Sequence, residues 1–197
     1  MTRLINTLTV PLIALALLAG CENMPWNKDK TSDAKKMANE GDKVAVAEIA
    51  PAQAASTQPS WGKPAGAITF TQTDGKVRVT GEVTGLSPGK HGIHIHDKGD
   101  MSDPALMSVG DHYNPDKHPH GGPSTSSVHA GDLGNLTADS SGKATIDLTV
   151  DDISIGGKND ILGKPVIIHA KEDDFKTQKP PGNAGARIAG GIIKMKK

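Results

Sequence analysis

The side chains best suited to chemistry are the histidines, because all eight in the chain lie between residues 91 and 169. His94 and His96 stand two apart in a stretch where isoleucines alternate with them. Side chains alternate across a β-strand, so both imidazoles project from one face and can bind one metal ion. The pair alone is also compatible with two polar residues on a solvent-exposed strand face. We expect the isoleucines to face the core and the histidines to face outward.

A second group of potential ligands lies in residues 97–142, a stretch of more than forty residues without a convincing period. It supplies three imidazoles and one carboxylate, from His112, His120, His129 and Asp132. This ligand number and type is the one that tetrahedral zinc prefers. Structureless loops of this length are uncommon in compact domains unless they are functional or disordered. Zinc binding would order the loop by adding its free energy to folding, whereas a solvated, histidine-rich loop is the alternative.

The elements that position these residues are predicted to be strands. Aromatic residues are only 3% of the chain while it has 23 Gly and 13 Pro, and no segment has a sustained helical period, so an all-β domain is expected. Strands are predicted at 43–49, 67–83 (a hairpin that turns at Thr73-Asp74-Gly75), 92–96, 144–150, 166–169 and 187–193. Lys plus Arg equals Asp plus Glu and no basic block occurs, which excludes nucleic-acid binding.

The N-terminus has the pattern of an export signal. Arg3 precedes an apolar run that is too short to span a bilayer, and the run ends in Leu-Ala-Gly-Cys. This ending resembles a bacterial lipobox, so we expect residues 1–20 to be a signal peptide and Cys21 to be lipid-modified and membrane-anchored. Residues 21–42 are then the lipidated cysteine and a polar tether, and 43–197 the folded domain. Glu22 favours the periplasmic face of the outer membrane.

Six motifs in order along the domain resemble the bacterial copper/zinc superoxide dismutases. They are HGIHIHDKGD, GDHYNP, HPHGGP, HAGDLGN, VIIHAKEDD and GNAGARIAGG. The resemblance implies a Greek-key β-sandwich, or flattened eight-stranded barrel, with long metal-binding loops. It also implies copper and zinc as cofactors and superoxide as the substrate.

The roles of individual residues are implied by the same resemblance. The copper ligands would be His94, His96, His112 and His169, and the zinc ligands would be His112, His120, His129 and Asp132. Asp173 would link a copper histidine to a zinc histidine through hydrogen bonds. Arg187 would attract superoxide beside the copper, and His112 would bridge the metals and supply a proton. His91 and His118 match no ligand; we expect a structural role for His91 and a solvated His118.

The chain also departs from the family pattern. The residues where relatives have a disulfide are Met101 and Gly190, so the intrasubunit disulfide is expected to be missing. Asp111 stands where a small residue commonly precedes the bridging histidine, and the loop 170–186 is shorter than in eukaryotic members. A lipoprotein that binds copper and zinc without turnover, and a structural envelope protein, are the alternative functions. The sequence leaves monomer and homodimer open.

Overall fold

The computed structural model describes residues 41–197; the expected signal peptide, Cys21 and the tether up to residue 40 lie outside the described residues. The described part contains β1 (Lys43–Pro51), β2 (Ala65–Thr73), β3 (Lys76–Thr84), β4 (Gly89–Ile95), β5 (Asp132–Ala138), β6 (Ala144–Val150), β7 (Pro165–His169) and β8 (Arg187–Met195). Short 3-10 turns are η1 (Gln53–Thr57), η2 (Pro59–Trp61) and η3 (Met107–Val109). Within residues 41–197, no helix has the length and apolar character needed to cross a membrane.

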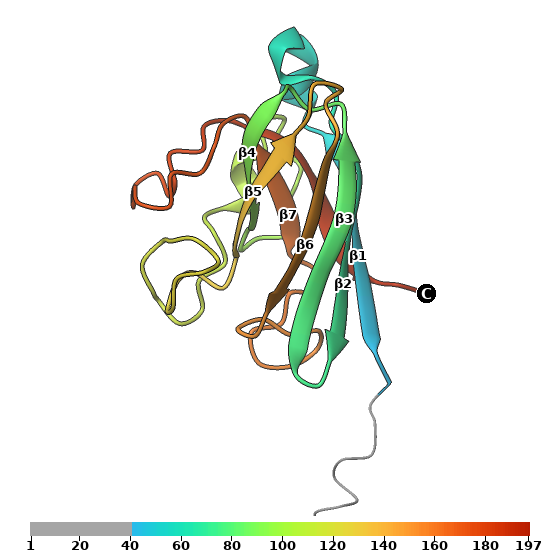
Figure 1. The fold of residues 1–197 in the computed structure, drawn as a ribbon, viewed down its shortest axis with the longest axis vertical. Helices are drawn as coiled ribbons and strands as arrows, with labels where there is room; N and C mark the ends of the chain where they lie inside the picture. Colours follow the sequence, from blue (N-terminus) through green and yellow to red (C-terminus); the bar gives the residue numbers. More distant parts are fainter. Residues whose placement is uncertain (1–40) are drawn as a thin grey trace, which may run out of the picture. The chain divides into compact units, whose positions relative to one another are not determined.

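The eight strands form one antiparallel sheet that curls into a nearly closed, flattened barrel (Figure 1). Its strand order is β5-β4-β7-β8-β1-β2-β3-β6. β8 pairs with both β1 and β7, and so joins a layer of β1, β2, β3 and β6 to a layer of β4, β5 and β7. The chain crosses between layers from β3 to β4, from β5 to β6 and from β6 to β7, as in a Greek key. The expected all-β barrel is confirmed.

The β2–β3 hairpin shows how local sequence builds this barrel. Thr73 pairs with Lys76, which leaves a two-residue turn of Asp74 and Gly75 with φ of 51° and 78°. Positive φ at both positions fits the turn that matches the twist of paired strands, and Asp-Gly is a favoured sequence for it. Alternate side chains of β3, including Val79, are fully buried between the layers. Burying each such valine stabilises the fold by about 1.5–3 kcal/mol.

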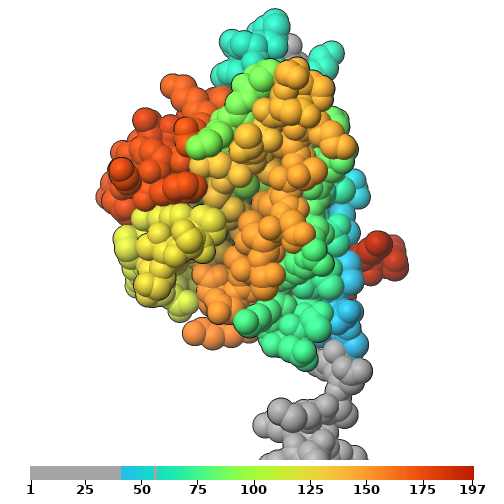
Figure 2. All heavy atoms as spheres, in the orientation of Figure 1, coloured from blue at the N-terminus to red at the C-terminus, as the bar shows by residue number. Residues whose placement is uncertain are grey.

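The expectation that the histidine face of β4 lies outward is wrong. His94 and His96 are 0% exposed, as are the isoleucines between which they alternate. The loop after β4 and the loop after β7 lie side by side over this region, drawn in yellow and in orange-red in Figure 2. They are joined where the His120 amide donates to Gln178 Oε1 at 2.9 Å. From His91 onward, both faces of β4 are therefore inside the molecule.

The expectation of a continuous structureless stretch from 97 to 142 is also wrong, because β5 lies within it. β5 pairs with β4, but its register shifts so that Gly92 lies opposite Asn135 and His94 opposite Asp132. This irregularity places one extra residue in β5, where Gly134 has φ of 94°. The extra residue interrupts the two-residue alternation, which explains why the sequence pattern did not predict the strand.

Candidate metal centre

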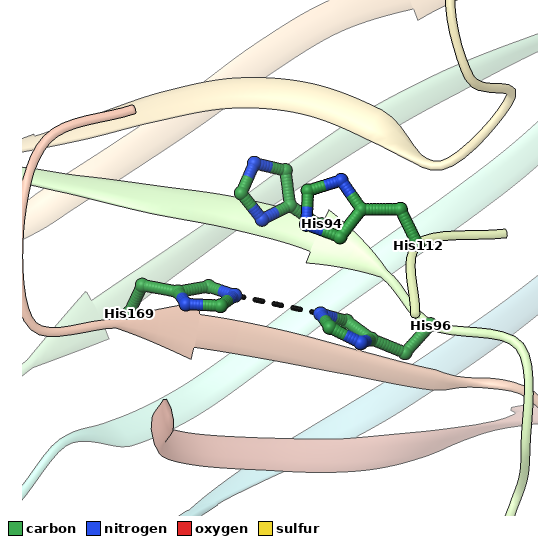
Figure 3. A group of neighbouring side chains, drawn as sticks. All are labelled: His94, His96, His112 and His169. Carbon is green, nitrogen blue, oxygen red and sulfur yellow. Dashed lines mark hydrogen bonds between the residues drawn. The ribbon is translucent and has the colours of Figure 1, made fainter. Parts of the chain in front are cut away.

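Two groups of four potential ligands meet at one end of β4. In each group, one ligand atom from every residue lies within 4.8 Å of those from the others. The first group is His94, His96, His112 and His169, and the second is His112, His120, His129 and Asp132. His112 belongs to both. Figure 3 shows how the four imidazoles of the first group, from β4, β7 and the loop after β4, gather around one region.

Backbone carbonyls determine which nitrogen of two rings faces this region. His96 Nδ1 donates to the Gly110 carbonyl at 2.9 Å, and His169 Nδ1 donates to the Gly185 carbonyl at 3.2 Å. A neutral imidazole has one N–H, so the Nε2 of each ring holds a lone pair. These two Nε2 atoms approach to 3.4 Å, the contact drawn in Figure 3. Two lone pairs facing each other favour a cation between them.

Burial keeps three rings of the first group neutral, those of His96, His112 and His169. Loss of hydration lowers the pKa of both His96 and His169 well below 6.5, and neighbouring histidines lower it further. The pKa of His112 falls to about 4, mainly because of burial and then because of His94. Neutral imidazole is the form that binds metal. At physiological pH these three rings are therefore in the state that a copper ligand requires.

Asp173 connects the two groups and is only 1% exposed. Its Oδ2 accepts a hydrogen bond from His94 Nε2 at 2.6 Å, and its Oδ1 accepts one from His120 Nε2 at 2.9 Å. Burial raises the pKa of Asp173, but the hydrogen bonds from His120 and His94 outweigh this effect and the pKa is strongly lowered. A carboxylate in this position fixes ring orientation and tautomer. It leaves the Nδ1 atom of each ring free to bind a metal.

The second group is arranged around Asp132, which is 3% exposed. Its Oδ1 lies 2.8 Å from His112 Nδ1, and its Oδ2 lies 2.9 Å from His120 Nδ1. Burial lowers the pKa of His120, but Asp132 and Asp173 together raise it to about 9. Burial acts to raise the pKa of Asp132, whereas the three histidines lower it well below its usual range. Three nitrogens and one carboxylate thus share one small volume, as in a zinc site.

Buried atoms without hydrogen-bond partners show that both groups fit a metal. Within residues 41–197 these atoms are the Nδ1 nitrogens of His94, His120 and His129. His120 Nδ1 is close to Asp132 but is not directed along a hydrogen bond to it, so we interpret that contact as charge attraction. Buried polar groups are rarely left unsatisfied. All three orphaned nitrogens belong to the two groups, where a bound ion would provide the missing partner.

A cavity of about 700 Å³ opens the first group to solvent. Its wall includes His96, His112, His169 and Arg187. The guanidinium of Arg187 donates through Nη1 to the Leu106 carbonyl and through Nη2 to the Gly110 carbonyl, both at 2.7 Å. These bonds hold a positive charge at the cavity wall beside the histidines. A small anion entering the cavity would meet both.

Comparison with known proteins agrees with this geometry. Residues 64–193 match the model of the family described as copper/zinc superoxide dismutase. The chain belongs to the copper/zinc superoxide dismutase family. It is 44% identical over 155 residues to the extracellular superoxide dismutase [Cu-Zn] of Drosophila melanogaster, covering 75% of this chain and 82% of that protein. It is similar, at 41% identity and a TM-score of 0.67, to the crystal structure of the clock protein EA4, covering 78% of this chain and 94% of that one.

Membership in this family establishes the activity and the cofactors. The chain is a superoxide dismutase, and its cofactors are copper and zinc. The structure brings every residue that the sequence indicated as a ligand into one of the two groups. Arg187 lines the adjoining cavity, and Asp173 contacts one histidine of each group.

The positions expected to lack a disulfide are close together in the superoxide dismutase fold. A Cβ atom built on Gly190 would lie 3.2 Å from the terminal methyl group of Met101. Met101 is partly buried and packs against the core. The methionine therefore fills space beside Gly190 and contributes apolar contact between the loop after β4 and β8.

Several positioning residues were not identified from the sequence. Asn135 in β5 donates through Nδ2 to the Asp173 carbonyl at 2.9 Å, and its Oδ1 accepts from the Asp173 amide at 2.8 Å. Gln178 makes the same kind of paired hydrogen bonds with the backbone of His120: its Oε1 accepts from the His120 amide, and its Nε2 donates to the His120 carbonyl. A polar residue in a strand or loop carries no periodic signal, so these contacts could be found only in three dimensions.

Of the predictions for the two remaining histidines, the one for His91 is confirmed and the one for His118 is not. His91 is 1% exposed, and its ring nitrogens each lie 2.8 Å from a carbonyl oxygen, that of His169 or that of Ser87. It has the structural role that was expected. The expectation that His118 is solvated is wrong: its side chain is half-buried, with Nδ1 3.2 Å from the Val128 carbonyl. It braces the same loop that carries the zinc group.

Proposed function

We propose that His94, His96, His112 and His169 hold the copper of this superoxide dismutase, and that His112, His120, His129 and Asp132 hold the zinc. The observation that carries this assignment is the pair of four-ligand groups that share His112. The first group consists only of imidazoles and borders the open cavity, as a redox copper that exchanges electrons with a small molecule requires. The second contains a carboxylate and is closed by the loop, as in a structural zinc site.

The residues of the chain have separate tasks in dismutation. Copper, when bound, supplies the one-electron exchange by which one superoxide becomes dioxygen and a second, with two protons, becomes hydrogen peroxide. Arg187 attracts and orients the anion at the cavity wall. His112 can hold a proton at Nε2, on the side away from Asp132, and deliver it to the reduced substrate. Asp173 keeps the rings of His94 and His120 in the tautomer that binds metal.

Substitution of one ligand from each group tests the assignment. His169→Ala should lower the amount of copper bound per chain and abolish catalysed superoxide decay, while the protein retains zinc. His129→Ala should lower the amount of zinc bound per chain more than the amount of copper, because His129 belongs only to the second group. Metal content and the rate of superoxide decay are measured on the same samples. Equal loss of both metals in both variants would contradict the separate assignment, and metal binding without decay in the wild type would favour a storage protein.

The location is a further part of the proposal. Residues 1–20 form a signal peptide, Cys21 carries the lipid, residues 22–42 form a tether, and the enzyme domain spans 43–197. The export pattern of the sequence supports this, and so does the similar protein from Drosophila melanogaster, which is named extracellular. The lipid would hold the enzyme on the periplasmic face of the outer membrane. Labelled fatty acid should be incorporated into the wild type, whereas Cys21→Ala should remain unlabelled and appear in the soluble fraction.

A further inference from the structure

The cavity beside the copper group contains a carboxylate, Asp111, next to the bridging histidine in the sequence. Asp111 is exposed and lines the same wall as Arg187 and Lys179. Those three side chains give the cavity one negative and two positive charges. The substrate is an anion, so a carboxylate on its path acts against the attraction of the two cations.

The contacts of Arg187 indicate that Asp111 does not hold it in place. The hydrogen bonds of its guanidinium go to the carbonyls of Leu106, Met107 and Gly110. Among residues 41–197, no ion pair within 4.0 Å involves Asp111. The two opposite charges nevertheless interact through space: burial lowers the pKa of Arg187, and the carboxylate of Asp111 acts in the opposite direction. The carboxylate changes the field at the cavity without positioning the arginine.

The backbone of Asp111 has a separate structural task. Its carbonyl accepts a hydrogen bond from the Asp97 amide at 3.0 Å, which fixes the chain just before His112. This bond involves no side-chain atom, so replacement of the carboxylate by an amide of equal size leaves it in place. The charge of Asp111 can therefore be removed without disturbing the loop that presents the ligand.

We propose that the carboxylate of Asp111 slows superoxide capture, because it reduces the positive potential of the copper cavity. The inference rests on the proposed copper site. Removing the negative charge of Asp111 raises the net side-chain charge of the cavity wall from +1 to +2. One unit charge at a solvent-exposed wall changes the energy of a nearby anion by roughly RT, so Asp111→Asn should raise the second-order rate of superoxide decay about two- to fivefold at low ionic strength.

The test compares variants of the metal-loaded enzyme at low and high salt, with the rate expressed per bound copper. Asp111→Asn should be faster at low salt, and the gain should disappear near 1 M salt, where the Debye length is about 3 Å. Asp111→Glu retains the charge and should behave like the wild type. Asp74→Asn is the matched control, because it removes the same charge from the tip of the β2–β3 hairpin, where Asn fits a positive φ.

The outcomes separate the possibilities. The inference is supported if superoxide decay per bound copper is faster and more salt-sensitive in Asp111→Asn, while the rate of Asp74→Asn equals that of the wild type. An unchanged rate overturns it, and a slower rate with normal copper shows that the carboxylate positions the substrate or Arg187 instead. An equal gain in both asparagine variants assigns the effect to net charge and also overturns it. Absence of decay in the copper-loaded wild type contradicts the proposed site itself and not this inference alone.

Discussion

The zinc group should account for much of the stability of the long loop, and His129→Ala tests this. The loop from Asp97 to Gly131 contains no β-strand, and the second group draws its four ligands from this loop and the first residue of β5. His129 contributes an Nδ1 atom that is buried and without a hydrogen-bond partner. A zinc ion bound to the native state alone adds its binding free energy to folding.

The size of the effect follows from mass action. Free zinc at a thousand times its Kd stabilises the native state by about 4 kcal/mol. A domain of residues 43–197 has an unfolding entropy of about 0.33 kcal/mol/K at its midpoint, so the Tm should rise by about 12 °C. If loss of one ligand weakens affinity about a hundredfold, the same zinc concentration stabilises His129→Ala by only about 1.4 kcal/mol, or roughly 4 °C.

Calorimetry of metal-stripped protein, with and without buffered zinc, measures this difference. The matched control is His118→Ala, because His118 lies in the same loop but outside both groups. That variant should start from a slightly lower Tm and still gain about as much from zinc as the wild type. If zinc leaves the wild-type Tm unchanged, or if His129→Ala gains as much as the control, the loop is not stabilised by this site and the reasoning is refuted.

Three other results are expected. Arg187→Ala should lower the superoxide decay rate by about tenfold and weaken its dependence on salt while copper remains bound; unchanged kinetics would exclude attraction by Arg187. Asp173→Asn should weaken metal affinity by about 10–100-fold in competition with a chelator, because an amide cannot accept from both imidazoles it now links; unaltered affinity would contradict its positioning role. In metal-free protein, unfolding free energy should fall as pH drops from 6.5 towards 4, by up to about 1.4 kcal/mol per pH unit for each of His96, His112 and His169; a flat profile from urea unfolding would show that these rings are not buried.

The sign of the pH effect follows from the lowered histidine pKa values. Burial holds the pKa of His112 at about 4, below its ordinary 6.5, so the unfolded state binds more protons between these values. Stability is therefore complete above pH 6.5 and is lost as the pH falls. His120 has a raised pKa of about 9, so its contribution is fully present below 6.5 and does not alter the slope in this window.

Regular elements of the fold were predictable because their burial is periodic. β3 alternates buried and exposed residues, and the Asp74-Gly75 turn has the backbone freedom that the hairpin needs. β5 was missed because its bulge breaks the alternation. The prediction that the histidine face of β4 lies outward was wrong, because strand periodicity shows which residues share a face but does not show what covers that face. Here the cover comes from two loops distant in sequence.

The candidate site was predictable as a set of residue types, whereas its fine structure was not. Spacing placed His94 and His96 on one face, and the residue types of the loop indicated His112, His120, His129 and Asp132 as a second group. The family resemblance added His169 and the sharing of His112 between the two groups. The carbonyls of Gly110 and Gly185, which determine the tautomers, belong to residues without functional side chains. Asn135 acts on Asp173 across 38 residues of sequence, a pairing that arises only when β5 and the loop after β7 come together.

The central claim is that one copper and one zinc bind at adjoining groups that share His112. Metal analysis of the reconstituted enzyme, combined with superoxide decay followed on the same sample, tests it most directly. We expect one copper and one zinc per chain, rapid decay, and loss of that decay together with copper in His169→Ala. Full activity in that variant, or one metal per chain in the fully active wild type, would contradict the account.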